Sequence, residues 1–226
     1  MQQHCVEWQS VTKTYRTQSG NVVALDRVSL AIAAGECIGL SGRSGSGKTT
    51  LLNVLGFCAA PDSGVVRFRG EQIPNQQSSV HQSLRRTSVG FIFQYFNLLP
   101  GLTALENVTV MMLLNRVDPA NARVRAEELL KQVSLGPRAH HYPHQLSGGE
   151  MQRVAVCRAL AHNPALILAD EPTGNLDSAA GSAVLELLES AVASGVTCVI
   201  ASHSREVLSR CHRILALQDG MLREAE

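Results

Sequence analysis

Residues 42–49 have the types and spacing needed to bind a polyphosphate. They read GRSGSGKT, which matches the pattern G-x-x-x-x-G-K-[ST] between an expected strand and an expected helix. Glycines at 42, 45 and 47 allow backbone N–H groups to approach an anion closely, and the helix start adds roughly half a positive charge. We expect Lys48 to reach the β- and γ-phosphates and Thr49 to offer its hydroxyl to Mg²⁺. A glycine loop that contains a lysine by chance does not account for this context.

A pair of acids ends an apolar run late in the chain. The run ALILADE finishes with Asp170 and Glu171. At the carboxyl end of a parallel strand both side chains would lie beside the phosphates. We expect Asp170 to organise Mg²⁺, directly or through water, and Glu171 to face the attacking water. Taken alone, the pair fits a solvated strand end better, and the loop at 42–49 favours the catalytic interpretation. No N-K-x-D guanine signature is visible, which favours ATP.

A second glycine-rich helix start lies about a hundred residues further on, at Ser147, Gly148, Gly149 and Glu150. Ser147 and Glu150 fit the capping box S-x-x-E, in which each side chain binds the other residue's backbone N–H. That structural interpretation is complete by itself, but it does not require two glycines. Each glycine costs roughly 1 kcal/mol relative to alanine in a formed helix turn. The pair is therefore typical of backbone that a ligand approaches closely.

Composition limits the class of protein that carries these residues. The chain has 226 residues, enough for one large domain or a domain with an inserted lobe. Hydrophobic residues make up 45% and aromatic residues 4%, which predicts a mostly aliphatic core. A net charge of +1 without a basic run argues against a nucleic-acid partner. The six cysteines form no C-x-x-C pair, so we expect reduced, mostly buried thiols. No signal peptide is expected, and the apolar runs are shorter than the ~20 residues of a membrane-spanning helix.

Strand and helix patterns place the motifs in an α/β core with a helical insertion. Apolar, β-branched runs predict strands at 22–25, 28–33, 36–42, 64–70, 89–94, 165–170, 196–202 and 213–220. Helical patterns cover 47–56, 104–116, 119–133, 148–161, 178–194 and 205–211, with Pro119 in a first turn. The alternation predicts a parallel sheet with helices on both faces. The stretch from about 97 to 161 contains no convincing strand.

The sequence resembles the ATPases of ABC transporters, over nearly the whole chain and in six ordered motifs. LSGGE at 146–150 resembles the family's signature motif, and Gln94 resembles its glutamine loop. LILADEPTGNLDS resembles the stretch with the magnesium aspartate, the catalytic glutamate and a following loop centred on Asp177. His203 in IASHS resembles the switch histidine, and Tyr15 occupies the place of the aromatic residue that stacks on adenine.

The resemblance implies a role for each of these positions. Positions implied to contact ATP within one chain are Tyr15, Gly42, Arg43, Ser44, Gly45, Ser46, Gly47, Lys48, Thr49, Thr50 and Gln94. A second copy, packed head to tail, would complete that site through Ser147, Gly148, Gly149 and Glu150, with Asp177 bridging the copies. The implied catalytic residues are Glu171 as general base, His203 and Lys48. The implied Mg²⁺ ligands are Thr49, Gln94 and Asp170.

Simpler structural interpretations remain open for three of these residues. Tyr15 could be a tyrosine at the edge of a strand, and Gln94 could be a polar residue at the end of a strand. His203 could be a structural histidine beside an apolar strand. Two positions depart from the family's habit, because Ser204 follows the histidine where Asp is frequent, and Met151 stands where a basic or polar residue is common. Neither departure removes a group that the chemistry needs.

The resemblance also implies an architecture. It is an α/β fold: a P-loop NTPase core with a mostly parallel sheet, an N-terminal antiparallel β subdomain and an inserted α-helical subdomain. We expect one domain over residues 1–226, with the core and β subdomain at 1–95 and 162–226 and the helical signature subdomain at 96–161.

Within the family, the sequence looks most similar to the bacterial lipoprotein-releasing, macrolide-export and cell-division group. This implies a separate integral membrane permease, with or without a periplasmic adaptor, at the cytoplasmic face of the bacterial inner membrane. Leu98 and Leu99 are candidates for the docking surface, and burial in the helical lobe is an equal alternative. The cargo would be a lipoprotein, lipid, drug or peptide. The alternative function is regulation of a cell-envelope or cell-division complex through a permease-like partner, without transport.

Overall fold

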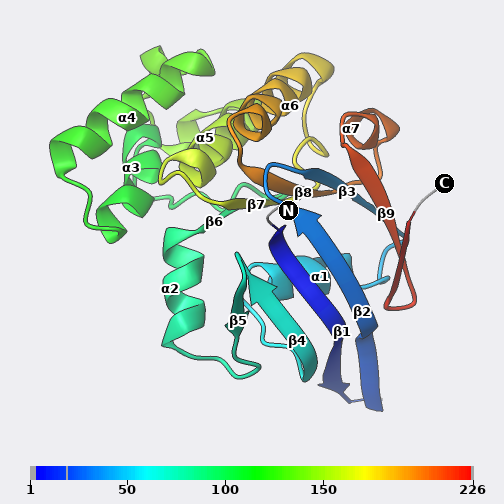
Figure 1. Ribbon diagram of the computed structural model, residues 1–226. Coiled ribbons are helices and arrows are strands. Elements are labelled where there is room, and N and C mark those ends of the chain that lie inside the picture. Colours follow the sequence, from blue (N-terminus) through cyan, green and yellow to red (C-terminus); the bar gives the residue numbers. More distant parts are fainter. Residues whose placement is uncertain (1–3, 19, 225–226) are drawn as a thin grey trace.

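Two β-sheets with helices around them form the molecule (Figure 1). The structure is a computed structural model that describes residues 4–18 and 20–224. The antiparallel sheet has the order β2-β1-β4-β5, with strands β1 (His4–Thr17), β2 (Gly20–Ala33), β4 (Ser63–Phe68) and β5 (Glu71–Ile73). The second sheet has the order β10-β9-β3-β8-β7-β6, with strands β3 (Cys37–Ser41), β6 (Val89–Ile92), β7 (Leu166–Asp170), β8 (Thr197–Ala201), β9 (Arg213–Gln218) and β10 (Met221–Glu224). Strand β10 is antiparallel to β9, and the other pairs of this sheet are parallel.

The register of the parallel strands brings the chemistry-bearing segments to one edge. Leu40 of β3 and Asp170 of β7 both lie opposite Ala201 of β8. The chain that leaves each of these strands therefore starts at the same level of the sheet. The glycine loop follows β3, the acid pair ends β7, and His203 follows β8. Ligands of open parallel sheets bind at this carboxyl edge.

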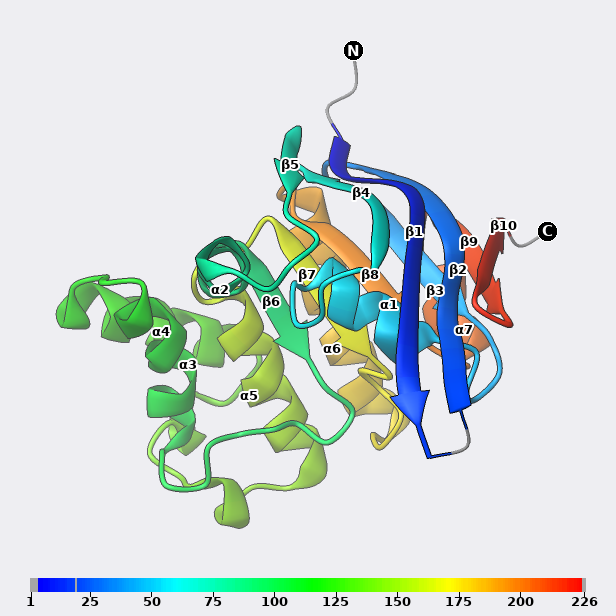
Figure 2. The same cartoon turned by 90° about the horizontal axis from the view of Figure 1, so that it is seen from below.

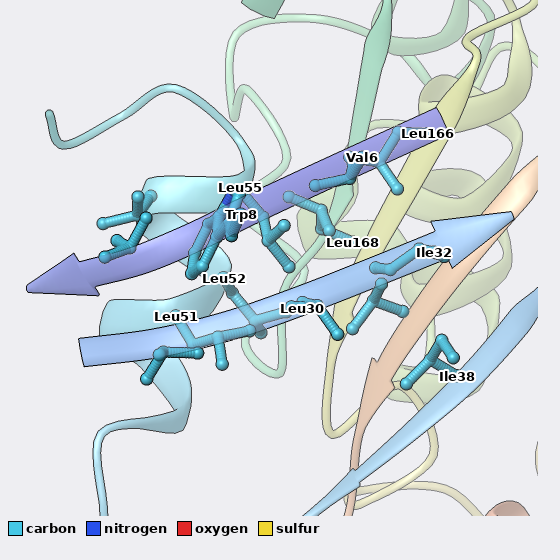
Figure 3. Packing of buried hydrophobic residues seen from close by; sticks show 14 of the residues in the cluster. Val6, Trp8, Leu30, Ile32, Ile38, Leu51, Leu52, Leu55, Leu166 and Leu168 are labelled. Carbon is cyan, nitrogen blue, oxygen red and sulfur yellow. The ribbon is translucent and has the colours of Figure 1, made fainter. Parts of the chain in front are cut away.

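Helix α1 (Lys48–Leu55) lies between the two sheets, as the views from two directions show (Figures 1 and 2). Its leucines pack against Trp8 and Leu30 of the antiparallel sheet and against Leu166 and Leu168 of the parallel one (Figure 3). This core anchors the helix that begins directly after the glycine loop. The loop is thereby held from both sides, by β3 before it and by a buried helix after it.

The opposite face of the parallel sheet is covered by helices α5 (Gly148–Leu160), α6 (Ser178–Ala193) and α7 (Arg205–Ser209). Ile167 and Ala169 of β7 point into that second core, whereas Leu166 and Leu168 point toward α1. A strand covered on both faces must be apolar at every position. This explains the unbroken run LILA before the two acids.

A helical layer of α3 (Ala104–Leu114), α4 (Pro119–Gln132) and α5 forms a third core around residues such as Val108, Leu130 and Val154. Thr103 begins α3 with a capping box, and Asp118 caps α4 with Pro119 in its first turn. Two short 3₁₀ helices, η1 (Gly136–Arg138) and η2 (Pro143–Gln145), lead back to α5. The expected helices of this stretch and the first-turn position of Pro119 are confirmed.

The α/β fold with an antiparallel N-terminal sheet is confirmed, and sequence reasoning missed several elements. Helix α2 (Ser79–Thr87) buries only His81 completely, and Val80 and Leu84 are its only aliphatic side chains, so it shows no apolar run. Strand β1 contains register shifts that break its alternation, and β5 and β10 span three and four residues. All six cysteines are free; four are buried, Cys211 is half-buried and Cys58 is exposed. Within the described residues, no helix has the length and hydropathy to cross a membrane.

Candidate active site

A cavity of about 990 Å³ opens at the carboxyl edge of the parallel sheet. It gathers residues that are distant in the sequence and that the sequence singled out for chemistry. The members from that set are Tyr15, Ser44, Gly45, Ser46, Gly47, Lys48, Thr49, Thr50, Gln94, Asp170, Glu171 and His203. The tertiary structure thus brings the loop, the acid pair, the glutamine, the histidine and the tyrosine to one place.

The glycines of the loop serve different purposes. Gly42 and Gly47 have φ values of 153° and 108°, and a side-chain Cβ would lie 2.4 Å from Leu217 O or Ala24 O respectively. These two glycines are therefore required by neighbouring backbone of the same chain. Gly45 has φ 78°, and among the described residues nothing lies within 4 Å of the position that a Cβ would take, so its surroundings are open. A ligand can approach the loop most closely there.

Lys48 is a buried cation at the mouth of the loop. Its Nζ donates to Gly42 O at 2.6 Å and to Arg43 O at 3.1 Å, and it lies 3.5 Å from His203 Nε2. Beside it, Thr49 Oγ1 donates to Asp170 Oδ2 at 3.3 Å. A positive charge and a hydroxyl thus lie on adjacent residues at the start of α1, and the hydroxyl meets the carboxylate at the end of β7.

Glu171 has a strained backbone and two unlike carboxylate oxygens. Its φ of 46° is a left-handed conformation, which costs about 1–3 kcal/mol for a residue with a side chain. Its N–H donates to Ala201 O at 2.9 Å, so strand β8 supports this conformation. Oε2 accepts a hydrogen bond from Ser202 Oγ at 3.0 Å. Within the described chain, Oε1 is buried without a hydrogen-bond partner and lies 3.7 Å from His203 Nε2.

Sequence reasoning missed several residues of this cavity. Val22 and Val23 lie beside Tyr15 and are about half exposed, at 49% and 50%. Further missed lining residues are Thr17, Ala24, Gly174, Asp219 and Gly220. Exposed apolar side chains next to an aromatic residue indicate a binding surface, but their exposure is known only from the structure. Asp219 and Gly220 line the cavity only because β9 ends beside the glycine loop, and no local sequence pattern predicts that neighbourhood.

The signature segment lies outside this cavity. Glu150 N donates to Ser147 Oγ at 3.3 Å, and Ser147 N donates to Glu150 Oε2 at 2.8 Å, which forms the expected capping box. The backbone hydrogen bond from Ser147 is the main reason that the pKa of Glu150 is lowered, and Arg138 at 3.2 Å acts in the same direction. The Glu150 carboxylate is therefore engaged within its own chain. Its contact with a nucleotide stays a prediction.

The two signature glycines differ in what surrounds them. A Cβ at Gly149 would lie 3.1 Å from Ala180 Cβ, so close packing of α5 on α6 favours glycine there. A Cβ at Gly148 would meet only Phe96 Cζ at 3.7 Å, an ordinary contact. The described part of the chain therefore gives a reason for Gly149 and none for Gly148.

Three further expected positions also lie apart from the cavity. Asp177 caps α6 by accepting from Ala180 N at 2.8 Å. Gly42 and Arg43 line a neighbouring depression against the end of β9. The main-chain carbonyls of these two residues, at least, reach the Lys48 ammonium.

The two leucines after Gln94 have different environments. Leu98 packs against the core of the helical layer, whereas Leu99 is 45% exposed. Leu99 lines an apolar groove of about 510 Å³ together with Phe91, Phe93, Met111 and Leu114. Leu98 is thus packed in the helical lobe, and Leu99 lies at the surface, where a partner could reach it.

Comparisons with known proteins agree on one family. Residues 25–174 match the family model described as ABC transporter. The lipoprotein-releasing system ATP-binding protein LolD of Maricaulis maris is 43% identical over 223 residues, covering 98% of this chain and 97% of that protein. The macrolide export ATP-binding/permease protein MacB of Azoarcus sp. is 43% identical over 215 residues, or 95% of this chain and 33% of that protein. The chain thus spans about a third of that relative's length.

A solved structure supports the same conclusion. The dimeric structure of the ATP-binding cassette MJ0796 in a post-hydrolysis state, bound to ADP and Pi, superposes with a TM-score of 0.91. It is 40% identical, and the superposition covers 98% of both chains.

Proposed function

The chain belongs to the ABC transporter ATP-binding family, and from this membership we propose that it is the ATPase subunit of a bacterial transporter. Two copies would close on ATP and drive a membrane permease that exports or extracts a substrate. The observation that carries the proposal is the cavity that unites the Lys48 loop with Asp170, Glu171 and His203. Adenine would lie on the apolar strip of Tyr15, Val22 and Val23, and the phosphates would lie against the loop.

Lys48 is prepared for a phosphate oxygen. An ammonium group has three N–H donors, and two of them are used by Gly42 O and Arg43 O. The remaining donor lies toward His203 Nε2, at 3.5 Å. A phosphate oxygen in front of these two nitrogens would accept from Lys48 and contact His203 at the same time. Both residues therefore serve the terminal phosphate.

The residues of the cavity fit Mg²⁺. The hydroxyl of Thr49 and the carboxylate of Asp170 are hard oxygen donors, 3.3 Å apart, and Gln94 lines the same cavity. These three residues would hold the ion. When bound with ATP it would neutralise charge on the β- and γ-phosphates.

Glu171 would take the proton of the attacking water. Its Oε1 is buried without a hydrogen-bond partner in the described chain and lies 3.7 Å from His203 Nε2, so its lone pair would accept that proton from a water admitted beside His203. Its left-handed backbone and its hydrogen bond to β8 fix the carboxylate near His203. A positioned general base contributes about 10²–10⁴-fold to the rate.

The second copy would supply the other side of the triphosphate. Gly148 and Gly149 open helix α5, whose N-terminal N–H groups favour an anion. The absence of any close contact at Gly148 among the described residues supports an external reason for its glycine. Ser147 and Asp177 would stand at the same interface, each also capping its own helix.

The permease would dock on the groove around Leu99. The groove follows Gln94 along the chain, so an occupied ATP site and a docked permease would act on the same segment. The names of the LolD and MacB relatives support a permease partner, and with it a place at the cytoplasmic face of the inner membrane. A periplasmic adaptor would act through that permease.

ATP turnover and dimerisation test the proposal together. We expect Glu171→Gln to bind ATP, to lose about 10²–10⁴-fold in turnover and to accumulate as a dimer on size exclusion with light scattering. Lys48→Ala should remain monomeric because its affinity for ATP is lower. Turnover by Glu171→Gln at the parent rate would exclude Glu171 as the base. Unchanged ATP affinity of Lys48→Ala would refute the assignment of the loop.

A further inference from the structure

Ser202 is a fully buried polar residue between strand β8 and His203. Its exposed fraction is 0%, and its backbone N–H donates to Leu40 O at 3.1 Å. That bond joins the end of β8 to the end of β3, directly before the glycine loop. Ser202 is therefore fixed to the two strands on which the ATP site is built.

The hydroxyl of Ser202 has a defined direction. Its oxygen accepts a hydrogen bond from Ser204 N at 3.1 Å, and a backbone N–H can only donate. The single hydroxyl proton is thus left for the other neighbour, Glu171 Oε2, at 3.0 Å. An ionised carboxylate only accepts, so donor and acceptor match along the whole chain of bonds.

The two oxygens of Glu171 consequently have separate environments. Oε2 is held by Ser202, whereas Oε1 has no hydrogen-bond partner among the described residues and lies near His203. The carboxylate can rotate only by giving up the bond to Ser202. We propose that Ser202 is a positioning residue that fixes Oε2 and thereby directs Oε1 at the attacking water. This inference rests on the proposed role of Glu171 as general base.

The expected consequence is a change in turnover and not in ATP binding. Ser202 does not line the cavity, so its hydroxyl contributes nothing directly to ATP affinity. Without the hydroxyl the Glu171 carboxylate would sample rotamers in which Oε1 points away from the water. A misplacement of about 1 Å costs on the order of 10²-fold in a positioned reaction.

Three single variants test the role of Ser202. We expect Ser202→Ala to lose about 10- to 100-fold in kcat, with KM for ATP and ATP-dependent dimerisation within about twofold of the parent. Ser202→Thr keeps the hydroxyl and should restore most of the turnover. Ser204→Ala is the matched control, because it removes the cap of α7 but keeps the backbone N–H that binds Ser202. It should leave kcat near the parent value.

A double variant separates this inference from the proposed function. If Ser202 acts through Glu171, then adding Ser202→Ala to Glu171→Gln should leave the residual rate unchanged. A further loss of the size seen in the single variant would overturn the positioning role, as would parent-like turnover of Ser202→Ala. Equal losses in Ser202→Ala and Ser202→Thr would overturn it too. Parent-like turnover of Glu171→Gln would instead refute the proposed role of Glu171 as general base, on which this inference rests.

Discussion

Replacing Gly148 with alanine separates the needs of the single chain from those of the closed dimer. In the chain, a Cβ at this position meets only Phe96 Cζ at 3.7 Å, and Gly148 is the first residue of α5. Alanine is favoured over glycine in a helix by about 0.5–1 kcal/mol. For a chain of this length the unfolding temperature should therefore rise by about 1–4 °C.

The same methyl group should weaken the ATP-dependent dimer. If the partner's triphosphate packs directly against the Gly148 backbone and accepts from its N–H, the phosphate oxygens would occupy the space that an added methyl group needs. Loss of one hydrogen bond to a charged group costs about 1.5–3 kcal/mol. The head-to-tail dimer would contain two such sites, so the loss is about 3–6 kcal/mol in total and the dimer dissociation constant should rise roughly 10²- to 10⁴-fold.

The assay combines thermal unfolding without nucleotide and sedimentation with ATP, the latter in the Glu171→Gln background. Gly101→Ala is the matched control, because no described atom lies within 4 Å of its added Cβ and the residue is exposed. It should change neither property. Gly149→Ala is less informative, since its Cβ would lie 3.1 Å from Ala180 Cβ and disturb the chain itself. A Gly148→Ala protein that dimerises as tightly as its parent would refute the contact between Gly148 and the partner's ATP.

Two further predictions concern stability and docking. Hydrogen bonds from the backbone N–H and the hydroxyl of Thr103 lower the pKa of Glu106. Because the folded pKa is lowered, these bonds stabilise the folded protein above the unfolded pKa of Glu106, and the stabilisation is lost as pH falls through the folded pKa. The difference in unfolding temperature between the parent and Glu106→Gln should therefore shrink between about pH 6 and about pH 3, and a difference that is constant with pH would contradict this cause. Leu99→Asp should abolish co-purification with a membrane permease from detergent extracts, because Leu99 lies in the apolar groove. The isolated variant should keep its ATPase activity, because Leu99 does not line the ATP cavity. Retained co-purification would move the docking surface elsewhere.

Local patterns were sufficient for the parts of the site that are continuous in the chain. The loop at 42–49, the acids after LILA and the capping box of Ser147 and Glu150 are each defined by neighbours within a few residues. The strand and helix on either side of the loop follow from periodicity, because each buries a regular set of apolar side chains. Helix α2 escaped this reasoning since little of it is buried.

Other features depended on residues that are distant in the sequence. Val22 and Val23 join the cavity only because β2 passes beside the loop, and nothing local distinguishes them from other strand valines. The difference between Leu98 and Leu99 is likewise one of packing, since adjacent apolar residues can face a core or a groove. The domain boundaries and the roles of the site residues stay predictions.

The sequence by itself determined the family, the fold class and the identity of the reacting groups, because these are written in short motifs and in periodic burial. The tertiary structure alone decided how those groups face one another. Ser202 shows the difference most clearly: its type and position carry little signal, yet the fold places its hydroxyl 3.0 Å from Glu171 Oε2. Hydrogen bonds act over about 3 Å, so only the register of β3, β7 and β8 could bring that pair within range.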